Sequence, residues 1–336
     1  MSVGASCGES YGITVSPTMS WLPDNVLLEV LGFLSVRDLI RSGRVCKRWK
    51  RLIMDKSLWK NVDLTPYKLN SKIFWHLVRH RIGTSLQTLK VKGLLNSAKK
   101  QEFLTSAVLQ EMEKRYPNLE NLHLEETSLR SLNYKCFPST LKTLGLHQCE
   151  IPMDWLKASP TKNKNLSNLQ TLVLRNVSSF SNHHLETICS QSSLKTLSLT
   201  GTYRVNDIGI QKAVPYLKSL EHLKLHGCSI TDITLHLIGC HMKHLRILAL
   251  TNFRSLTDSG LSCISGVKTL ETLWLEHCNG LSSNCIIAVC VTLPVLKYLN
   301  LNGIIFEGRG IDEIRKSLPN CRITNSIPGM DSTLKL

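Results

Sequence analysis

The residues of this chain best suited to chemistry are its twelve histidines and twelve cysteines. Histidine and cysteine are common zinc ligands, and a cysteine thiolate is also a nucleophile. His76 and His80 lie four residues apart in a segment of helical periodicity, so both rings fall on one helix face. No third ligand lies nearby, and the glutamate of a zinc-protease helix is missing. We therefore expect partly exposed histidines and no metal site.

The cysteines are placed too regularly for a catalytic or metal centre. Cys149, Cys228 and Cys278 end three copies of a recurring motif, and Thr127 and Thr202 end two others. Metal ligands must converge on one point, whereas residues that recur once per copy form a ladder. We expect these small side chains to bond to the backbone between copies, with no disulfides.

The remaining sequence signals exclude several protein classes. There is no glycine-rich phosphate loop, no zinc-protease helix and no nucleophile elbow, so we expect neither catalytic residues nor a cofactor. No apolar run approaches the roughly 20 residues that cross a bilayer, and residues 1–19 do not resemble a signal peptide. We expect a cytoplasmic or nuclear protein without membrane contact.

The recurring motif is Leu-x-x-Leu-x-Leu, and it determines the predicted fold. Its last six copies begin 25 or 26 residues apart, a period typical of leucine-rich repeats. Each copy supplies a short strand, and the stacked strands form a parallel sheet lining a horseshoe. We predict an α/β fold with about nine repeats over residues 86–324, whose motifs begin at Leu86, Leu119, Leu141, Leu169, Leu194, Leu220, Leu245, Leu270 and Leu296.

The second half of each repeat should form a helix that begins at a side-chain cap. Ser181, Asn206, Thr231 and Thr257 carry oxygens that accept the free N–H groups of a first helical turn. Residues between the motif leucines should face the concave side, because side chains alternate along a strand. The predicted substrate-binding surface there is an exposed apolar and aromatic patch beside a basic group, made of Ile247, Trp274, Tyr298, His222, Lys224 and His226. Residues 327–336 are the alternative occupant of that patch.

Residues 20–60 form a separate predicted module of three short helices. Pro23 is tolerated in the first turn, and Ser35 with Asp38 resembles a capping box at the second helix. About 40 residues bury only a small core, so some apolar surface should await a partner. Residues 1–19 and 325–336 are predicted tails, and 61–85 a linker with one strand and one helix. The polar segments 96–101 and 159–165 are predicted loops.

The ordered residues of this module resemble the F-box, by which substrate receptors dock on Skp1 in SCF ubiquitin ligases. The resemblance runs from Leu22-Pro23 through Asp38-Leu39 and residues 45–49 to Leu58-Trp59, with Val30-Leu31 in place of the usual Ile-Phe. Module and repeats together resemble the F-box/leucine-rich-repeat proteins. This resemblance implies a non-catalytic receptor that joins a protein substrate to Skp1, cullin and RING subunits. The basic residues His222, Lys224 and His226 beside the concave patch indicate an acidic or phosphorylated segment in that substrate. The Skp1-binding residues implied are Leu22, Pro23, Val26, Leu27, Val30, Leu31 and Trp49.

The formal net charge of +16 leaves two other functions to weigh. A basic protein can bind nucleic acid, but lysines and arginines are scattered here without a long block. The densest cluster lies at residues 47–51 and should form the solvated face of the third helix. A nucleic-acid-binding repeat protein and a scaffold without degradative function remain alternatives. We expect a protein partner and no nucleic acid.

Overall fold

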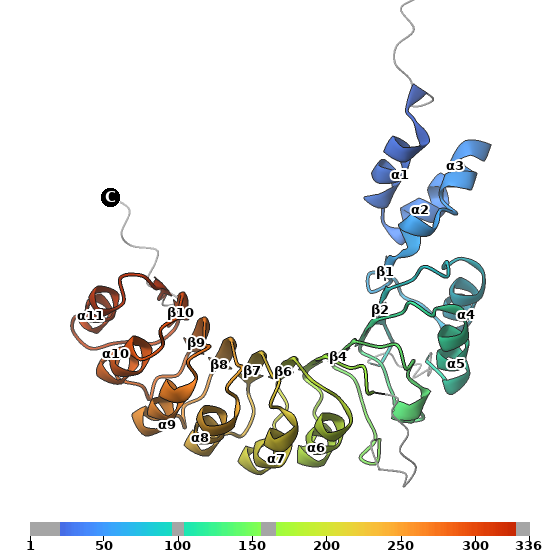
Figure 1. Ribbon diagram of the computed structural model, residues 1–336. Coiled ribbons are helices and arrows are strands. Elements are labelled where there is room, and N and C mark those ends of the chain that lie inside the picture. The colour runs from blue at the N-terminus through green and yellow to red at the C-terminus, as the bar shows by residue number, and fades with distance from the viewer. Residues whose placement is uncertain (1–20, 96–103, 156–165, 327–336) are drawn as a thin grey trace, which may run out of the picture. The chain divides into compact units, whose positions relative to one another are not determined.

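The computed structural model describes residues 21–95, 104–155 and 166–326. The chain divides after Trp59 into two compact units, a helical module and a repeat array, and each is described by itself (Figure 1). The predicted loops at 96–101 and 159–165, the predicted tail at 1–19, and residues 327–336 of the predicted tail at 325–336 lie outside the described residues.

The helical module contains α1 (Asp24–Gly32), α2 (Val36–Ser42), α3 (Lys47–Leu52) and the 3₁₀ turn η2 (Lys56–Trp59). Ser35 is the N-cap of α2, as predicted, whereas Pro23 is the N-cap of α1 and precedes the first turn in which it was predicted. The Ser35 hydroxyl accepts the Asp38 N–H at 3.2 Å, but the Asp38 carboxylate accepts from that hydroxyl at 2.7 Å instead of from the Ser35 backbone. The capping box is therefore half formed, because aspartate is one methylene shorter than glutamate.

The core of the module is small and is supported by polar contacts. Leu27, Leu31 and Trp59 are almost completely buried, and the Trp59 indole N–H donates to the Ile53 carbonyl at 2.7 Å. Asp24 at the start of α1 pairs with Arg48 and Arg51 of α3 at 2.7 and 2.5 Å. These contacts lower the pKa of Asp24, chiefly through the Arg48 hydrogen bond. Arg48 and Arg51 belong to the basic face that was predicted to be solvated, but they link α3 to α1.

The repeat array is built on one sheet of eleven parallel strands in chain order. The nine predicted strands are present, and β1 and β11 extend the sheet at its ends. Residues 61–85 contain one strand and one helix, as predicted, and the strand, β1, pairs with β2 from Asn61 opposite Thr88 onward. The strands are β1 (Asn61–Asp63), β2 (Thr88–Lys92), β3 (Asn121–Glu125), β4 (Thr143–His147), β5 (Thr171–Arg175), β6 (Thr196–Thr200), β7 (His222–His226), β8 (Ile247–Thr251), β9 (Thr272–Glu276), β10 (Tyr298–Asn300) and β11 (Arg322–Thr324).

Within the array the strands line the concave side and the helices cover the convex side (Figure 1). The motif leucines pair in register, such as Leu172 with Leu197, and are buried on the side of the helices. The prediction that the residues between the motif leucines face the concave side is confirmed by this pattern. The helices are α4 (Ser71–His80), α5 (Ser106–Arg115), α6 (Asn182–Gln191), α7 (Asp207–Ala213), α8 (Asp232–His241), α9 (Asp258–Cys263), α10 (Ser283–Val291) and α11 (Gly310–Ser317), with 3₁₀ turns η3 (Tyr134–Cys136), η4 (Val214–Tyr216) and η5 (Ile264–Gly266).

Successive helices are joined by an aspartate ladder at their N-termini. The predicted caps Ser181, Asn206, Thr231 and Thr257 all occupy N-cap positions. The first residue of each of α7, α8 and α9 is an aspartate whose carboxylate accepts both the backbone N–H and the hydroxyl of the next cap. Asp232, for example, accepts from Thr257 at 2.9 and 2.6 Å. Each helix start thus also fixes the spacing to the next coil.

We predict that Gly239→Ala destabilises the array although it raises helix propensity. In an isolated helix this change gains about 1 kcal/mol. Here an added methyl would lie 2.0 Å from the carbonyl oxygen of Cys263, a backbone atom of the next coil. Overpacking of this kind costs about 1–3 kcal/mol, so the midpoint of urea unfolding should fall. A rise in the midpoint would show that the coils can move apart at this position.

A second prediction concerns acid sensitivity and rests on the buried His184. Its Nδ1 accepts the Ser181 N–H at 3.1 Å and its Nε2 donates to the Met153 carbonyl at 3.1 Å, which requires the neutral ring. Burial lowers the pKa of His184 below the ordinary 6.5. The unfolded chain then binds the extra proton more readily, so stability falls as the pH drops below about 6.5.

We expect the melting temperature to fall by roughly 2–4 °C more between pH 7.5 and 5.5 in the wild type than in His184→Gln. Thermal melts followed by circular dichroism measure this difference. Burial also lowers the pKa of His123, so the wild-type protein would lose stability at low pH even without His184. The test is therefore the difference in the pH dependence of the melting temperature between the wild type and His184→Gln. An identical fall in melting temperature in the two proteins would assign the acid sensitivity to other groups.

Candidate protein-binding surfaces

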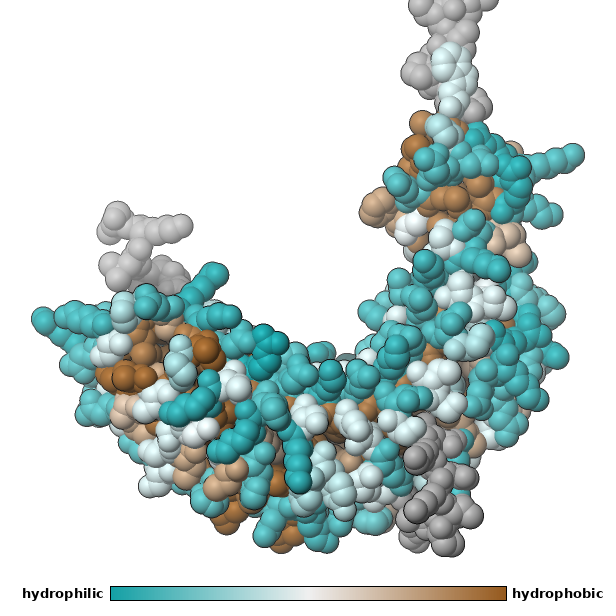
Figure 2. Space-filling model, viewed as in Figure 1, coloured by the Kyte–Doolittle hydropathy of each residue, from teal (hydrophilic) through white to brown (hydrophobic). Residues whose placement is uncertain are grey.

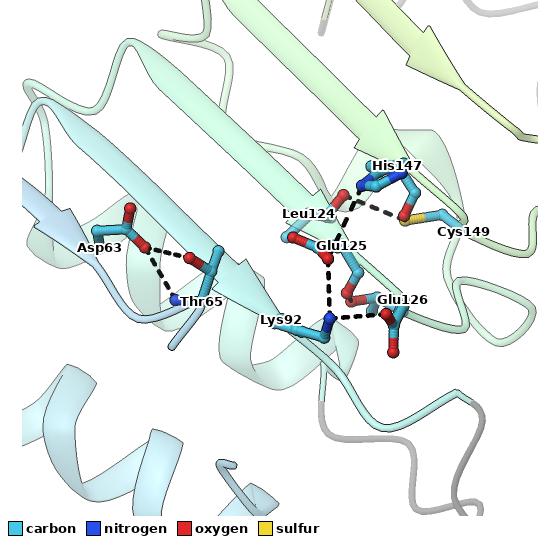
Figure 3. A network of polar contacts seen from close by, with 9 residues as sticks. Asp63, Thr65, Lys92, Leu124, Glu125, Glu126, His147 and Cys149 are labelled. Atoms are coloured by element: carbon cyan, nitrogen blue, oxygen red, sulfur yellow. Dashed lines mark hydrogen bonds and ion pairs between the residues drawn. The ribbon is translucent and has the colours of Figure 1, made fainter. Parts of the chain in front are cut away.

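The histidines and cysteines that the structure describes are not gathered into a metal-binding group. His76 and His80 are exposed on α4 with ring centroids 4.9 Å apart, and no metal-binding group of His, Cys, Asp and Glu occurs among the described residues. The Cys149 thiol donates to the Leu124 and His147 carbonyls at 3.3 and 3.4 Å (Figure 3). Burial raises the pKa of Cys149 and of Cys278 to about 11, so both stay protonated and serve packing, as predicted.

The N-terminal end of the concave side holds a paired charge network. Lys92 Nζ lies 2.9 Å from the Glu125 carboxylate and 2.7 Å from that of Glu126, and His147 approaches Glu125 at 3.8 Å (Figure 3). The hydrogen bonds to Glu126 and Glu125 raise the pKa of Lys92. The charge of Lys92 is balanced by two neighbouring carboxylates, so this network offers no excess positive charge to an anionic partner.

The first candidate surface is the outer side of α1 in the helical module. Val26, Val30 and Phe33 recur at helical spacing. Val26 is half-buried, Val30 is 41% exposed and Phe33 is 92% exposed. Leu22 and Trp49 are half-buried and Pro23 is exposed. Figure 2 shows hydrophobic residues gathered on this module. We call Leu22, Pro23, Val26, Val30 and Phe33 the α1 surface.

Two residues predicted to bind Skp1 lie on the other side of the helix. Leu27 and Leu31 are 0% and 1% exposed, because they pack into the module's own core. Their side chains are not accessible in this structure, so we propose a structural role for them in place of the predicted Skp1 contact. Phe33 was missed by the sequence analysis, although its position seven residues after Val26 was a usable signal.

The second candidate surface is the concave patch predicted on β7 to β10. Trp274 and Tyr298 lie with ring centroids 6.2 Å apart, and Lys224 Nζ lies 5.8 Å from the Trp274 ring. Together with His222, Ile247 and Ala249, Trp274 lines a cavity of about 210 Å³. The patch is half-buried, not exposed as predicted, because Lys224 and Tyr298 flank the indole ring.

The basic group beside the patch comes from one strand, β7. Lys224 is exposed, whereas His222 and His226 are half-buried, and His222 Nδ1 lies 3.2 Å from the Thr196 hydroxyl. In the neighbouring strand Ala249 stands opposite Lys224, and Trp274 stands opposite Ala249. Because the alanine side chain is small, a cavity remains above it, between Lys224 and the Trp274 indole. All six predicted substrate-binding residues therefore lie on one face of adjacent strands.

Comparison with known proteins explains the combination of these two units. Residues 19–65 match the F-box-like family model. Human F-box/LRR-repeat protein 12 is 38% identical over 314 residues, which cover 91% of this chain and 95% of that protein, and the mouse protein is 37% identical over 312 residues. The chain belongs to the F-box/LRR-repeat family. Its members generally act as substrate receptors of SCF ubiquitin ligases and are typically non-catalytic adaptors.

A solved structure supports the fold of this F-box/LRR-repeat protein. The yeast Rad7 and Elc1 complex contains a chain that aligns with a TM-score of 0.54 and 16% identity, covering 89% of this chain and 85% of that one. At this identity the likeness concerns the fold alone. In the part of the chain that the structure describes, no helix is long and apolar enough to cross a membrane.

Proposed function

We propose that this protein is the substrate receptor of an SCF ubiquitin ligase, in which the F-box binds Skp1 and, through it, the cullin and RING subunits. The observation that carries this proposal is the α1 surface. A module this small exposes a phenylalanine at 92% and a valine at 41%, although burying such side chains is its main source of stability. An exposed apolar stripe of this kind favours a permanent protein partner.

The α1 surface and Trp49 are the proposed Skp1 contacts. Val30 and Phe33 are free to transfer their exposed area into an interface, and Pro23 fixes the backbone where the helix begins. Leu27 and Leu31 hold the helix in place from behind. This division separates variants that weaken docking from variants that unfold the module.

The concave patch is the proposed substrate site. A half-buried tryptophan beside a lysine offers both an apolar anchor and a positive charge, which is typical of a binding hot spot. Lys224, with His222 and His226 on the same strand, favours an acidic or phosphorylated segment of the substrate. Such a receptor accelerates ubiquitin transfer by holding the substrate lysine near another subunit's active site.

The docking proposal is tested by titrating purified full-length protein with purified Skp1 in a calorimeter. We expect a one-to-one complex for the wild type and no measurable binding when Leu22→Ala and Pro23→Ala are combined. Circular dichroism must show that the repeat array of the variant remains folded. Full-strength binding by a folded variant would contradict the proposed contact surface.

A further inference from the structure

A groove lies along the edge of the sheet where the strands begin, and it shares no lining residue with the cavity of the concave patch. It has a volume of about 1080 Å³ and is lined by residues that precede five consecutive strands, β6 to β10, and by Asn320 before β11. Adjacent strands are about 4.8 Å apart, so the groove crosses about 19 Å of the array. An extended peptide of about six residues, at roughly 3.3 Å per residue, covers that length. We call it the flank groove.

The rim of the flank groove is cationic. Lys195, Arg246, Lys268 and Lys297 line it together with two carboxylates, those of Glu221 and Glu271, which leaves two positive charges in excess. Glu271 pairs with Arg246 and with Lys297, the latter at 2.9 Å, whereas Lys195 lies 3.5 Å from Glu221. A neighbouring hollow of about 600 Å³ shares His244 with the groove and adds Lys218 and Lys243.

One end of the groove is apolar. Pro294 and Val295 form part of its lining, and Val295 is 41% exposed. Lys268 stands beside this end and donates from Nζ to the Thr292 carbonyl at 2.8 Å, so its charge is held in place. The groove therefore combines fixed cations with a site for one apolar side chain.

We propose that the flank groove binds an extended acidic segment of a partner protein, with carboxylates at the lysines and an apolar side chain over Val295. Two observations favour a peptide over nucleic acid. Glu221 and Glu271 would repel an unbroken row of phosphates, and no Phe, Tyr or Trp is found in the described lining to stack a base. The inference is independent of Skp1 docking and of the concave patch.

The test is fluorescence anisotropy with full-length protein and a fluorescein-labelled peptide, Glu-Asp-Val-Ala-Asp-Glu, at physiological salt. Combining Lys195→Gln with Lys268→Gln should weaken binding about ten-fold or more. The matched control combines Lys142→Gln with Lys212→Gln. Lys142 precedes its strand as Lys195 does and pairs with Glu120 at 2.7 Å, and Lys212 pairs with Glu186 at 3.4 Å, but neither lines the groove.

The control pair should change the affinity by no more than about two-fold. Equal weakening by both pairs would mean that the peptide responds only to net charge and would overturn the proposal. So would undetectable binding to the wild type. An RNA hexamer that binds more tightly than the peptide, and depends on the same two lysines, would also overturn it by assigning the groove to nucleic acid.

Discussion

Full-length protein carrying Val30→Ala and Phe33→Ala should lose at least about 100-fold in affinity for Skp1, roughly 2.7 kcal/mol. Both side chains are exposed in the isolated module, so removing them should change its own stability by no more than about 0.5 kcal/mol. Titration calorimetry with purified Skp1 measures the affinity, and thermal melts measure the stability. Affinity should fall while stability is kept, because these exposed side chains contribute to an interface with Skp1 but not to the core of the module.

A matched control for this variant lies in the repeat array. Ile233 and Ile305 are 59% and 73% exposed, so changing both to Ala removes similar apolar area away from the F-box. Skp1 affinity should be unchanged in that protein. Leu27→Ala provides the contrast, since truncating a buried leucine costs about 2–5 kcal/mol and should unfold the module. Unaltered Skp1 binding by the Val30 and Phe33 variant would exclude the outer side of α1 as the docking surface.

Trp274→Ala should remove substrate capture while Skp1 binding and thermal stability are kept. A central tryptophan in an interface contributes more than about 2 kcal/mol, which corresponds to about a 30-fold loss of affinity. The ring is half-buried between Lys224 and Tyr298 and its motif neighbours Leu273 and Leu275 carry the core, so the fold should tolerate the change. Quantitative mass spectrometry of proteins retained after proteasome inhibition measures the loss.

Tyr203→Ala is the control for that experiment. Tyr203 is a large aromatic residue, 67% exposed, that does not line the concave cavity. Retained proteins should be the same as in the wild type. If Trp274→Ala lowers the melting temperature but retains the same proteins, the ring has a structural role and the hot-spot proposal is wrong.

The repeat array could be predicted because its information is local and repeated. Each Leu-x-x-Leu-x-Leu motif fixes one strand and its buried face, and caps such as Thr231 fix the helix starts. The two terminal strands fall outside the nine predicted motif copies because their motifs are incomplete: β1 has Val62 at the middle leucine and Leu64 at the last one, and β11 keeps only Ile323. Their membership of the sheet is decided by pairing with a neighbour, which no short motif records.

The binding surfaces were harder to predict because helical spacing gives a face but not its direction. In α1 two apolar stripes run side by side, and the sequence could not tell that Leu27 and Leu31 face the core whereas Val30 faces solvent. The flank groove was not predicted at all. Its basic residues come from separate coils, and only the stacking of Lys195, Arg246 and Lys297 at equivalent positions brings them to one edge.

Protein turnover tests the receptor account most directly. In cells that lack the native protein, the half-lives of the proteins retained through Trp274 should be compared between wild-type protein and the Val30→Ala, Phe33→Ala variant. The account predicts that these proteins are degraded faster with the wild type and accumulate with the variant, although both retain them. Equal half-lives in the two cell lines would contradict the account, because capture would then have no connection to ubiquitin transfer.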